Sequence, residues 1–231
     1  MRNYIIQNGI NSQLIDGLLI SELPPITKPL MRTQTEEIDG RDGDITIPLG
    51  YSAYDKEMII GLYGYYDIDK VVQYFSSSGE VTFSNEPDKV YKYNIFQPVD
   101  FERLAHFRTA TVTYHVQPFK TSAIEGVVSS VARENTLEIV NHGNVKSKPE
   151  ITLYGYGLCL LQVNGVNALH ARINEYLTID VEEMEAYKGS VLYNRAVSGD
   201  YDDLTLPVGR SVLSWTGNIT KLEIKNYSRW I

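Results

Sequence analysis

Short strand-forming runs separated by turn residues fill the second half of the chain. This regular alternation of strands and turns restricts the fold more than any other feature of the sequence. Gly, Asn, Asp or Pro lies between successive runs, and Asn164-Gly165 is a hairpin signal. No long helical pattern interrupts the series, which therefore predicts a two-sheet β-sandwich. The runs are Leu137–Val140, Glu150–Tyr154, Leu158–Val163, Leu169–Ile173, Tyr176–Asp180, Val191–Tyr193, Ser211–Trp215 and Lys221–Lys225.

The first half of the chain predicts a β-rich domain with one or two short helices. Asn8-Gly9 supplies the positive φ of a tight hairpin. Apolar residues at helical spacing predict a helix between Asp67 and Ser77, with Asp67 as its N-cap. A second short helix is expected over Asp100–Phe107, and the prolines between Glu22 and Met31 predict an extended connector.

The boundary between the halves follows the strand Thr111–Phe119. Pro118 lacks a backbone N–H, so we expect this strand to end there. Residues Lys120–Glu134 are small, polar and weakly patterned, as in a linker. We therefore expect one domain over residues 1–135 and a second over residues 136–231.

Charge and composition exclude several classes of protein. The net charge is −8, and neither half has the basic excess of a protein that grips phosphates. The single cysteine, Cys159, lies in an apolar run and is expected to be buried. No apolar run has the length of a signal peptide or membrane span, so we expect folding in a reducing cytoplasm. The 17 tyrosines favour strands and protein contacts.

Metal and cofactor sites are not expected. The acidic, glycine-rich segment Thr35–Asp44 suggests a calcium loop, but the twelfth position from Asp39 or Asp42 is Gly50 or Ala53 where an EF-hand needs Glu. The segment is instead expected to be a solvated turn or an interface loop. The four histidines have no metal-ligand spacing.

Two readings of the second half would give it a small-molecule site. Acidic residues between Asp180 and Glu185 and between Asp200 and Asp203 could pair as the acid and base of a glycosidase, although such loops are more often solvated. Tyr154, Tyr156 and Trp215 could stack on a sugar, although such residues are more often core or hairpin residues. We expect no catalytic residues.

Several ordered segments resemble the distal tail protein (Dit) family of long-tailed bacteriophages and phage-tail-like particles. No single segment is diagnostic, but their order and spacing over almost the whole chain are fairly specific. They are Ile38–Asp44, Val112–Phe119, Val140–Asn144, Lys148–Gly155, Leu177–Val181, Tyr187, Leu204–Gly209, Trp215–Asn218 and Arg229-Trp230.

The resemblance implies an N-terminal hub domain that forms a hexameric ring and a C-terminal galectin-like β-sandwich. Such a ring would join the tail tube to tail-tip hub, tail-associated lysin, baseplate or receptor-binding proteins at the virion tail tip. Its acidic residues would line a channel through which DNA passes. Within the segment from Arg32 to Asp44, we expect Arg32, Arg41, Asp42 and Asp44 to contact the neighbouring subunit.

The galectin-like label concerns the fold and does not carry sugar binding. His142 is followed by Gly143 and Asn144, without the Arg that would complete a galactoside site. A structural, non-enzymatic component is therefore the preferred reading. The alternative is a carbohydrate-binding module that recognises host cell-wall polymers.

Overall fold

The computed structural model describes residues 2–40, 42–124, 126–131 and 135–231, and it is mainly β. The chain divides into two compact units, Met1–Ala123 with Ile231 and Ile124–Trp230. The expected mainly β fold, with short helices confined to the first half, is confirmed. The two α-helices among the described residues are each seven residues long, and neither is long and apolar enough to cross a membrane.

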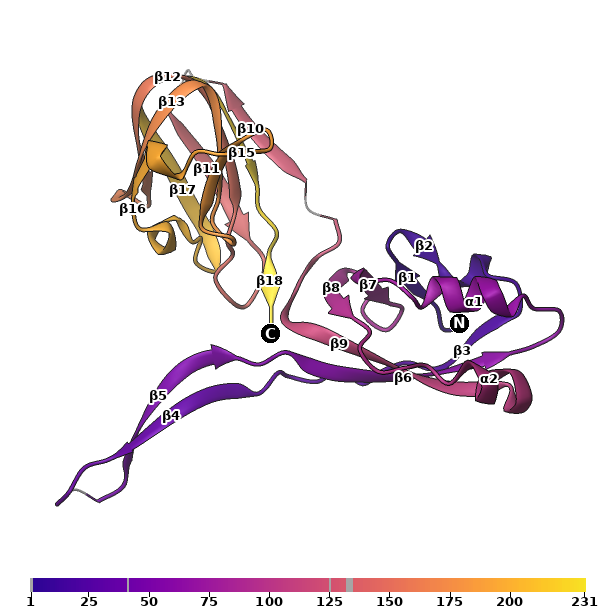
Figure 1. Cartoon of the computed structure of the whole chain (residues 1–231). Helices are drawn as coiled ribbons and strands as arrows, with labels where there is room; N and C mark the ends of the chain where they lie inside the picture. Colours follow the sequence, from indigo (N-terminus) through magenta and orange to yellow (C-terminus); the bar gives the residue numbers. More distant parts are fainter. Residues whose placement is uncertain (1, 41, 125, 132–134) are drawn as a thin grey trace. The chain divides into compact units, whose positions relative to one another are not determined.

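Unit 1 is built on an antiparallel sheet with strand order β2-β1-β7-β8-β9-β6-β3 (Figure 1). Asn8 and Gly9 have φ values of 50° and 80° and form the turn between β1 and β2 that the sequence predicted. The strands are β1 (Ile5–Gln7), β2 (Ile10–Asn11), β3 (Leu18–Glu22), β6 (Tyr54–Leu62), β7 (Gly79–Phe83), β8 (Lys89–Asn94) and β9 (Thr109–Ser122).

Two helices and one 3-10 turn, Ser12–Leu14, accompany this sheet. Helix α1 (Ile68–Tyr74) begins at the predicted N-cap, where Asp67 Oδ1 accepts hydrogen bonds from two backbone N–H groups of the first turn. Helix α2 (Phe101–Phe107) is capped by Asp100, whose Oδ1 accepts a hydrogen bond from the backbone N–H of Arg103. Both helices contribute buried residues to the unit 1 core.

The unit 1 core is centred on Tyr114, which is fully buried on β9. Its ring packs edge-on against Phe83 at 5.6 Å and against Tyr93 at 5.0 Å between ring centroids. Its hydroxyl donates to Gln7 Oε1 at 2.7 Å, so the one polar atom of this ring has a partner inside the core.

A separate two-stranded hairpin leaves unit 1 between β3 and β6. Its strands are β4 (Met31–Glu37) and β5 (Asp44–Tyr51), which pair only with each other (Figure 1). The sequence predicted an interface loop over part of this segment and missed its strands. Proline-rich residues 23–30 connect β3 to the hairpin without helix or strand, as expected.

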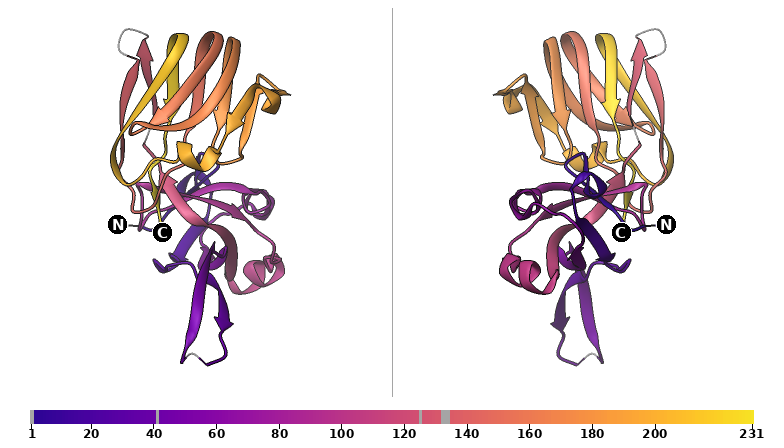
Figure 2. Two further views of the ribbon diagram at one scale, coloured as in Figure 1. Left: turned by 90° about the vertical axis from the view of Figure 1, so that its left-hand side faces the viewer. Right: turned by 90° about the vertical axis from the view of Figure 1, so that its right-hand side faces the viewer.

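Unit 2 is one continuous sheet that curls around its own core (Figure 2). Its path is β10-β17-β12-β13-β14-β15, while β11 pairs with β17 and β16 pairs with β13. The strands of this sheet are β10 (Val127–Val131), β11 (Thr136–Asn141), β12 (Glu150–Val163), β13 (Val166–Asp180), β14 (Glu185–Lys188), β15 (Val191–Leu192), β16 (Val197–Gly199) and β17 (Gly209–Lys225). The 3-10 turns Asn194–Ala196 and Tyr201–Leu204 lie between them, and the short strand β18 (Arg229–Trp230) lies outside this sheet.

Three pairs of expected short strands are each one long strand in unit 2. The sequence predicted a break between Glu150–Tyr154 and Leu158–Val163, but β12 continues through Gly155-Tyr-Gly157 with two register shifts against β17. A Cβ on Gly155 would lie 2.2 Å from the carbonyl oxygen of Asn218, so glycine allows the two strands to approach there. The residue acts as a bulge within one strand.

The expected end of the Thr111–Phe119 strand at Pro118 was wrong. Strand β9 runs to Ser122, because β8 pairs with it as far as that residue. Pairing with β6 ends at Val116, and the β8–β9 register shifts between Val116 and Lys120. The missing N–H of Pro118 therefore falls where the ladder is already irregular. Strand β10 lies inside the expected linker, before residue 135, and pairs with β17 of unit 2.

Candidate assembly interface

The β4–β5 hairpin is almost wholly exposed. Every residue of β4 is exposed, and in β5 only Ile45 and Tyr51 are half-buried. Among the described residues, no member of the unit 1 core lies on either strand. A two-stranded hairpin is marginally stable in water unless another layer covers it. The hairpin is therefore the strongest candidate in unit 1 for a surface that another protein covers.

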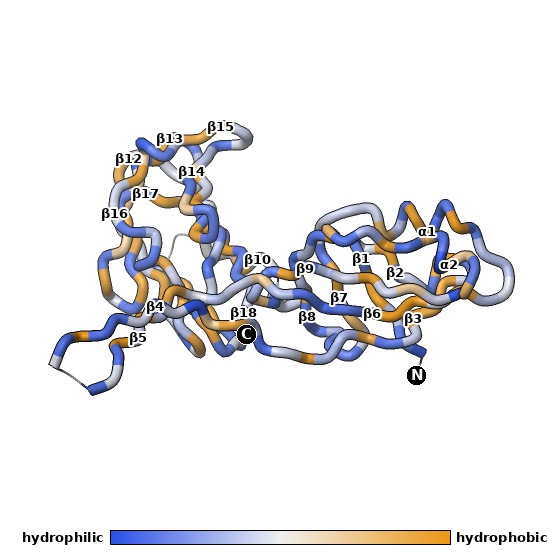
Figure 3. The backbone as a smooth tube through the Cα atoms, turned by 60° about the horizontal axis from the view of Figure 1, so that its bottom comes forward, coloured by the Kyte–Doolittle hydropathy of each residue, from blue (hydrophilic) through white to orange (hydrophobic). Residues whose placement is uncertain are grey.

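The two faces of the hairpin differ in chemistry. The register pairs Glu36 with Ile45 and Gln34 with Ile47, which places both isoleucines on one face among polar side chains. Threonines from both strands lie on the opposite face. Figure 3 shows hydrophobic and hydrophilic stretches along the same arm. Leu49, at the bulge opposite Arg32 and Thr33, is 51% exposed, so the arm offers apolar contacts as well as charge.

Three of the four residues expected at a subunit interface are described, and all three are on this hairpin. Arg32 lies on β4 and its Nη2 donates to the carbonyl oxygen of Leu49 at 3.2 Å across the bulge. Asp44 opens β5 opposite Glu37, and Asp42 lies in the exposed turn. Arg41 lies outside the described residues. The role of these residues in subunit contacts stays a prediction.

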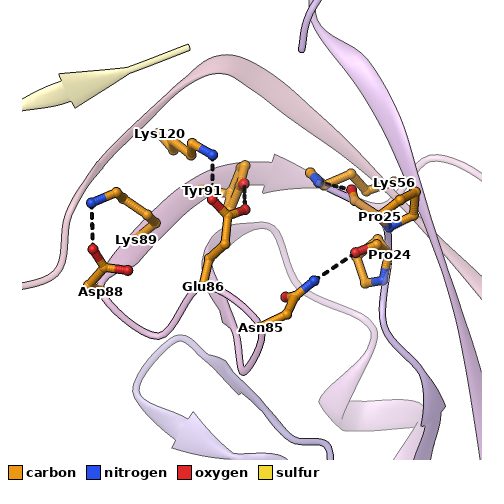
Figure 4. Close-up of polar contacts among 9 residues, drawn as sticks. All are labelled: Pro24, Pro25, Lys56, Asn85, Glu86, Asp88, Lys89, Tyr91 and Lys120. Atoms are coloured by element: carbon orange, nitrogen blue, oxygen red, sulfur yellow. Dashed lines mark hydrogen bonds and ion pairs between the residues drawn. The ribbon is translucent and has the colours of Figure 1, made fainter. Parts of the chain in front are cut away.

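The root of the hairpin is fastened to unit 1 by two side chains from separate strands and turns (Figure 4). Lys56 Nζ donates to the carbonyl oxygen of Pro25 at 2.7 Å, and Asn85 Nδ2 donates to that of Pro24 at 2.9 Å. Proline has no N–H, so the carbonyl is the only backbone group through which these two residues can be hydrogen-bonded. The two bonds therefore fix the chain as it leaves β3 for the hairpin.

Lys56 belongs to a nearly buried cluster of charges. Glu86 accepts hydrogen bonds from the hydroxyl of Tyr91 and from Nζ of Lys120, between which it lies in Figure 4. Lys56 is 3% exposed, and its Nζ lies 5.1 Å from the centroid of the Tyr91 ring. Burial lowers the pKa of Lys56 to about 8, while Glu86 opposes this shift and Lys120 adds to it. Burial and the charge of Glu86 raise the pKa of Tyr54 to about 12.

The expected sugar-stacking residues do not form one exposed platform. Trp215 is 2% exposed and lies in the unit 2 core, so its ring is not available to a sugar and the more frequent alternative, a core residue, holds for it. Tyr154 is half-buried: its hydroxyl donates to Glu223 Oε2 at 2.9 Å and its ring lies under Lys221 Nζ. Tyr156 is exposed. Aromatic residues are frequent in strands both as core residues and as binding residues. The sequence around these three residues contains no signal that distinguishes a buried ring from a ring that binds a ligand.

The acidic residues considered for a glycosidase have local structural roles. Asp180 Oδ1 accepts hydrogen bonds from the backbone N–H groups of Glu182 and Glu183, and Asp200 Oδ1 caps the 3-10 turn through Asp202 N–H. Glu182 also pairs with Arg229 at 2.9 Å. Within the described part of the chain, no three His, Cys, Asp or Glu side chains gather as a metal site.

Known structures share this fold over the whole chain. The crystal structure of the phage SPP1 Dit protein, a paradigm of the hub adsorption apparatus in phages that infect Gram-positive bacteria, matches 100% of both chains with a TM-score of 0.68 and 14% identity. A chain of the phage P2 baseplate in its activated conformation matches with a TM-score of 0.50 in the Ca form (98% of each chain) and 0.53 in the Sr form (98% and 97%), both at 11% identity. No family model and no curated sequence matches. The expected likeness to Dit proteins is therefore confirmed for the fold.

Proposed function

We propose that this protein is a structural, non-enzymatic component of a phage tail tip, where six copies form a ring. The ring joins the tail tube on one side to tail-tip hub, tail-associated lysin, baseplate or receptor-binding proteins on the other. The chain is made in the cytoplasm of the bacterial host and resides in the virion tail tip. The observation that carries the proposal is the full-length likeness to the SPP1 Dit hub.

The β4–β5 hairpin supplies a physical reason for assembly. Its exposed apolar side chains, including Ile47 and Leu49, leave part of its hydrophobic surface in water. Contact with a neighbouring copy removes that surface from water and gives the hairpin the layer that its own chain lacks. A heterologous contact of this kind closes into a ring when its rotation fits a whole number of subunits.

The acidity of the chain suits a channel for DNA. Residues 1–135 contain 12 basic and 18 acidic residues, a net charge of −6. In our proposal, part of this charge lines the lumen, so that passing DNA is repelled by the wall and does not bind to it. A ring map with a basic or neutral lumen would remove this part of the proposal.

Electron microscopy of the purified chain and of one variant tests the assembly. In the variant, Asn-Gly replaces residues 34–47, which joins the register partners Thr33 and Pro48 through a two-residue turn. The parent is expected to form six-membered rings and the variant to remain monomeric, with an unchanged circular-dichroism melting curve because the hairpin is outside the core. Rings of equal abundance in both samples would show that the hairpin is not the assembly element.

The carbohydrate-binding alternative has one remaining exposed candidate. Of the three aromatic residues considered for sugar stacking, only Tyr156 is exposed. A glycan-binding assay with host wall polymers compares the parent with Tyr156→Ala. The structural proposal expects no strong glycan preference in either protein, and saturable binding that Tyr156→Ala abolishes would favour the alternative.

A further inference from the structure

The proline-rich connector into the β4–β5 hairpin is fixed at its two ends. Pro24 and Pro29 are buried, and residues 25–28 between them are exposed. At the hairpin end, Ser52 N–H donates to the carbonyl oxygen of Leu30 at 2.9 Å, which joins the two sides of the hairpin at their base. The prolines also restrict the connector, because each ring fixes its own φ. The direction of the hairpin therefore depends on what holds the connector near Pro24.

The ammonium group of Lys56 lies in a cage of aromatic rings and reaches the connector. Its Nζ donates to the carbonyl oxygen of Pro25 at 2.7 Å. The same atom lies 5.7, 5.9 and 5.1 Å from the ring centroids of Tyr54, Phe83 and Tyr91. Aromatic faces attract a cation at these distances, and a hydrogen bond from a charged donor is about twice as strong as one from a neutral donor. No ion pair involves Lys56 in the part of the chain that the structure describes, so its charge acts on the cage and on the connector.

The second side chain on the connector, Asn85, lies in a turn that is itself held in place. It donates to the carbonyl oxygen of Pro24 (Figure 4). In the same turn, Tyr4 N–H donates to Ser84 Oγ and Ser84 N–H donates to the carbonyl oxygen of Tyr4, both at 3.0 Å. Lys56 lies on β6, between β9 and β3 in the unit 1 sheet. Two neighbouring prolyl carbonyls are thus fastened to two separate fixed parts of unit 1.

A small change of direction at the connector has a large effect at the far end of the hairpin. The seven residues of β4 extend about 23 Å. A swing of about 10° at the base therefore displaces the last residue of this strand by about 4 Å. On the other strand, the Tyr51 ring packs edge-on against Phe119 of β9 at 5.8 Å, which limits the swing from a second side.

We propose that Lys56 and Asn85 form a mount that holds the β4–β5 hairpin in one direction relative to the unit 1 sheet before any partner covers it. Both are positioning residues, because they act on the hairpin through the connector. A hairpin that already has its direction loses less conformational entropy when another protein covers it. The mount is a property of the free chain, and only its use in assembly rests on the proposed ring.

Pulsed electron paramagnetic resonance on a doubly spin-labelled chain tests the mount. Labels at Thr46→Cys on β5 and Thr111→Cys on β9 occupy exposed positions, and the native Cys159 is buried. The labelled chain is diluted with unlabelled parent, so that distances within one copy are measured whether or not rings form. The parent is expected to give a narrow distance distribution. With Lys56→Met and Asn85→Ala together, the distribution is expected to be about twofold broader, because a swing of about 20° moves Thr46 by about 6 Å.

Matched variants make the outcome decisive. Lys92→Met is the control, because Lys92 is an exposed lysine on β8 whose loss changes the net charge as Lys56→Met does. Asn85→Ala alone, at an exposed position, serves where the loss of Lys56 unfolds unit 1, and it is expected to broaden the distribution less than the double variant. A parent as broad as the double variant, or a double variant as narrow as Lys92→Met, overturns the mount. A parent that forms no ring contradicts the proposed function, and the distance measurement then still decides the mount.

The dependence on pH provides a second readout. The titratable groups that face Lys56 are Tyr54 on its own strand, Glu86 in the turn between β7 and β8, Tyr91 on β8 and Lys120 on β9, while Lys28 of the connector lies over the ring of Tyr51. Burial lowers the pKa of Lys56 to about 8, and burial raises the pKa of Tyr54 to about 12 and the pKa of Tyr91 above its usual range. Between about pH 7 and 9.5, Lys56 therefore loses its charge while both tyrosines keep their protons.

The distance distribution of the parent is expected to broaden over this pH interval. The neutral amine donates a weaker hydrogen bond to Pro25 and is no longer attracted as a cation by the rings. Lys56→Met alone should give the same distribution at both pH values, because it has no proton to lose. A parent distribution that is equally narrow at both pH values would show that the charge of Lys56 does not hold the connector.

Discussion

Replacing Glu86 by Gln removes a carboxylate that compensates two nearly buried ammonium groups. Lys56 and Lys120 are 3% and 8% exposed, and Glu86 accepts hydrogen bonds from Lys120 and Tyr91. The amide oxygen of Gln can still accept one of these bonds, but it carries no charge. The substitution therefore tests the charge itself and leaves the shape of the site almost unchanged.

The expected loss in the unfolding free energy of unit 1 is about 3 kcal/mol. Removing one partner of a buried ion pair costs about 3 to 5 kcal/mol, and the retained hydrogen bond reduces this toward the lower end. The side chains of Lys120 and Glu86 are 10% and 12% exposed. Arg210 and Glu138 in unit 2 provide a matched exposed pair, at 74% and 48%, for which Glu138→Gln is expected to cost less than about 1 kcal/mol.

The assay must report the two units separately. Trp215 lies in the unit 2 core, so with Trp230 replaced by Phe in every sample the tryptophan fluorescence follows the unfolding of unit 2. Hydrogen exchange in peptides that cover β6 and β9 follows unit 1. The hairpin-truncated chain is used as the background, so that assembly does not protect the amides. Glu86→Gln is expected to accelerate exchange in unit 1 and to leave the fluorescence transition unchanged.

A loss below about 1 kcal/mol in unit 1, no greater than the loss from Glu138→Gln in unit 2, would refute this reasoning. It would mean that water reaches the cluster and screens it like a surface pair. A loss of equal size in both units would instead show that the substitution acts on the whole chain and not on the cluster.

Two further predictions concern the root of the hairpin and the turn at Gly17. The pKa of Lys56 is about 8 in the folded chain, against 10.5 as its ordinary value, so the unfolded chain binds more protons between these values and the unfolding free energy of the parent rises with pH there. Urea unfolding at pH 7.5 and 10 should show this rise in the parent and its absence in Lys56→Met; a parallel rise in both would contradict it. Gly17→Ala should destabilise unit 1 by about 3 kcal/mol, because its Cβ meets Tyr65 O, whereas Gly9→Ala, at φ +80° with no atom within 4 Å, should cost only about 1 kcal/mol. Equal thermal shifts for the two glycine variants would show that the close contact is not what matters.

Local features of the fold were predictable from the sequence. The caps at Asp67 and Asp100 join atoms two or three residues apart, so their signals are contained in a short window. The Asn8-Gly9 and Asn164-Gly165 turns are equally local, and both pairs have positive φ.

Features that depend on distant parts of the chain were not predictable. The hairpin is exposed on both faces, so it lacks the alternation of apolar and polar residues that identifies a half-buried strand. Gly155 signals a bend or a bulge equally well, and only the approach of Asn218 decides between them. Lys56, Glu86 and Lys120 are about thirty residues apart in succession, so their cluster exists only after the strands pair.

The mass of the purified full-length chain in solution, measured by native mass spectrometry across concentration, tests the central claim most directly. The account predicts that the 26.2 kDa chain converts to a closed species of about 157 kDa, six times the monomer mass, without larger open forms. The hairpin-truncated variant should remain at the mass of one chain. A parent that stays monomeric at the highest concentration, or that grows into species without a fixed upper mass, would contradict a self-closing ring.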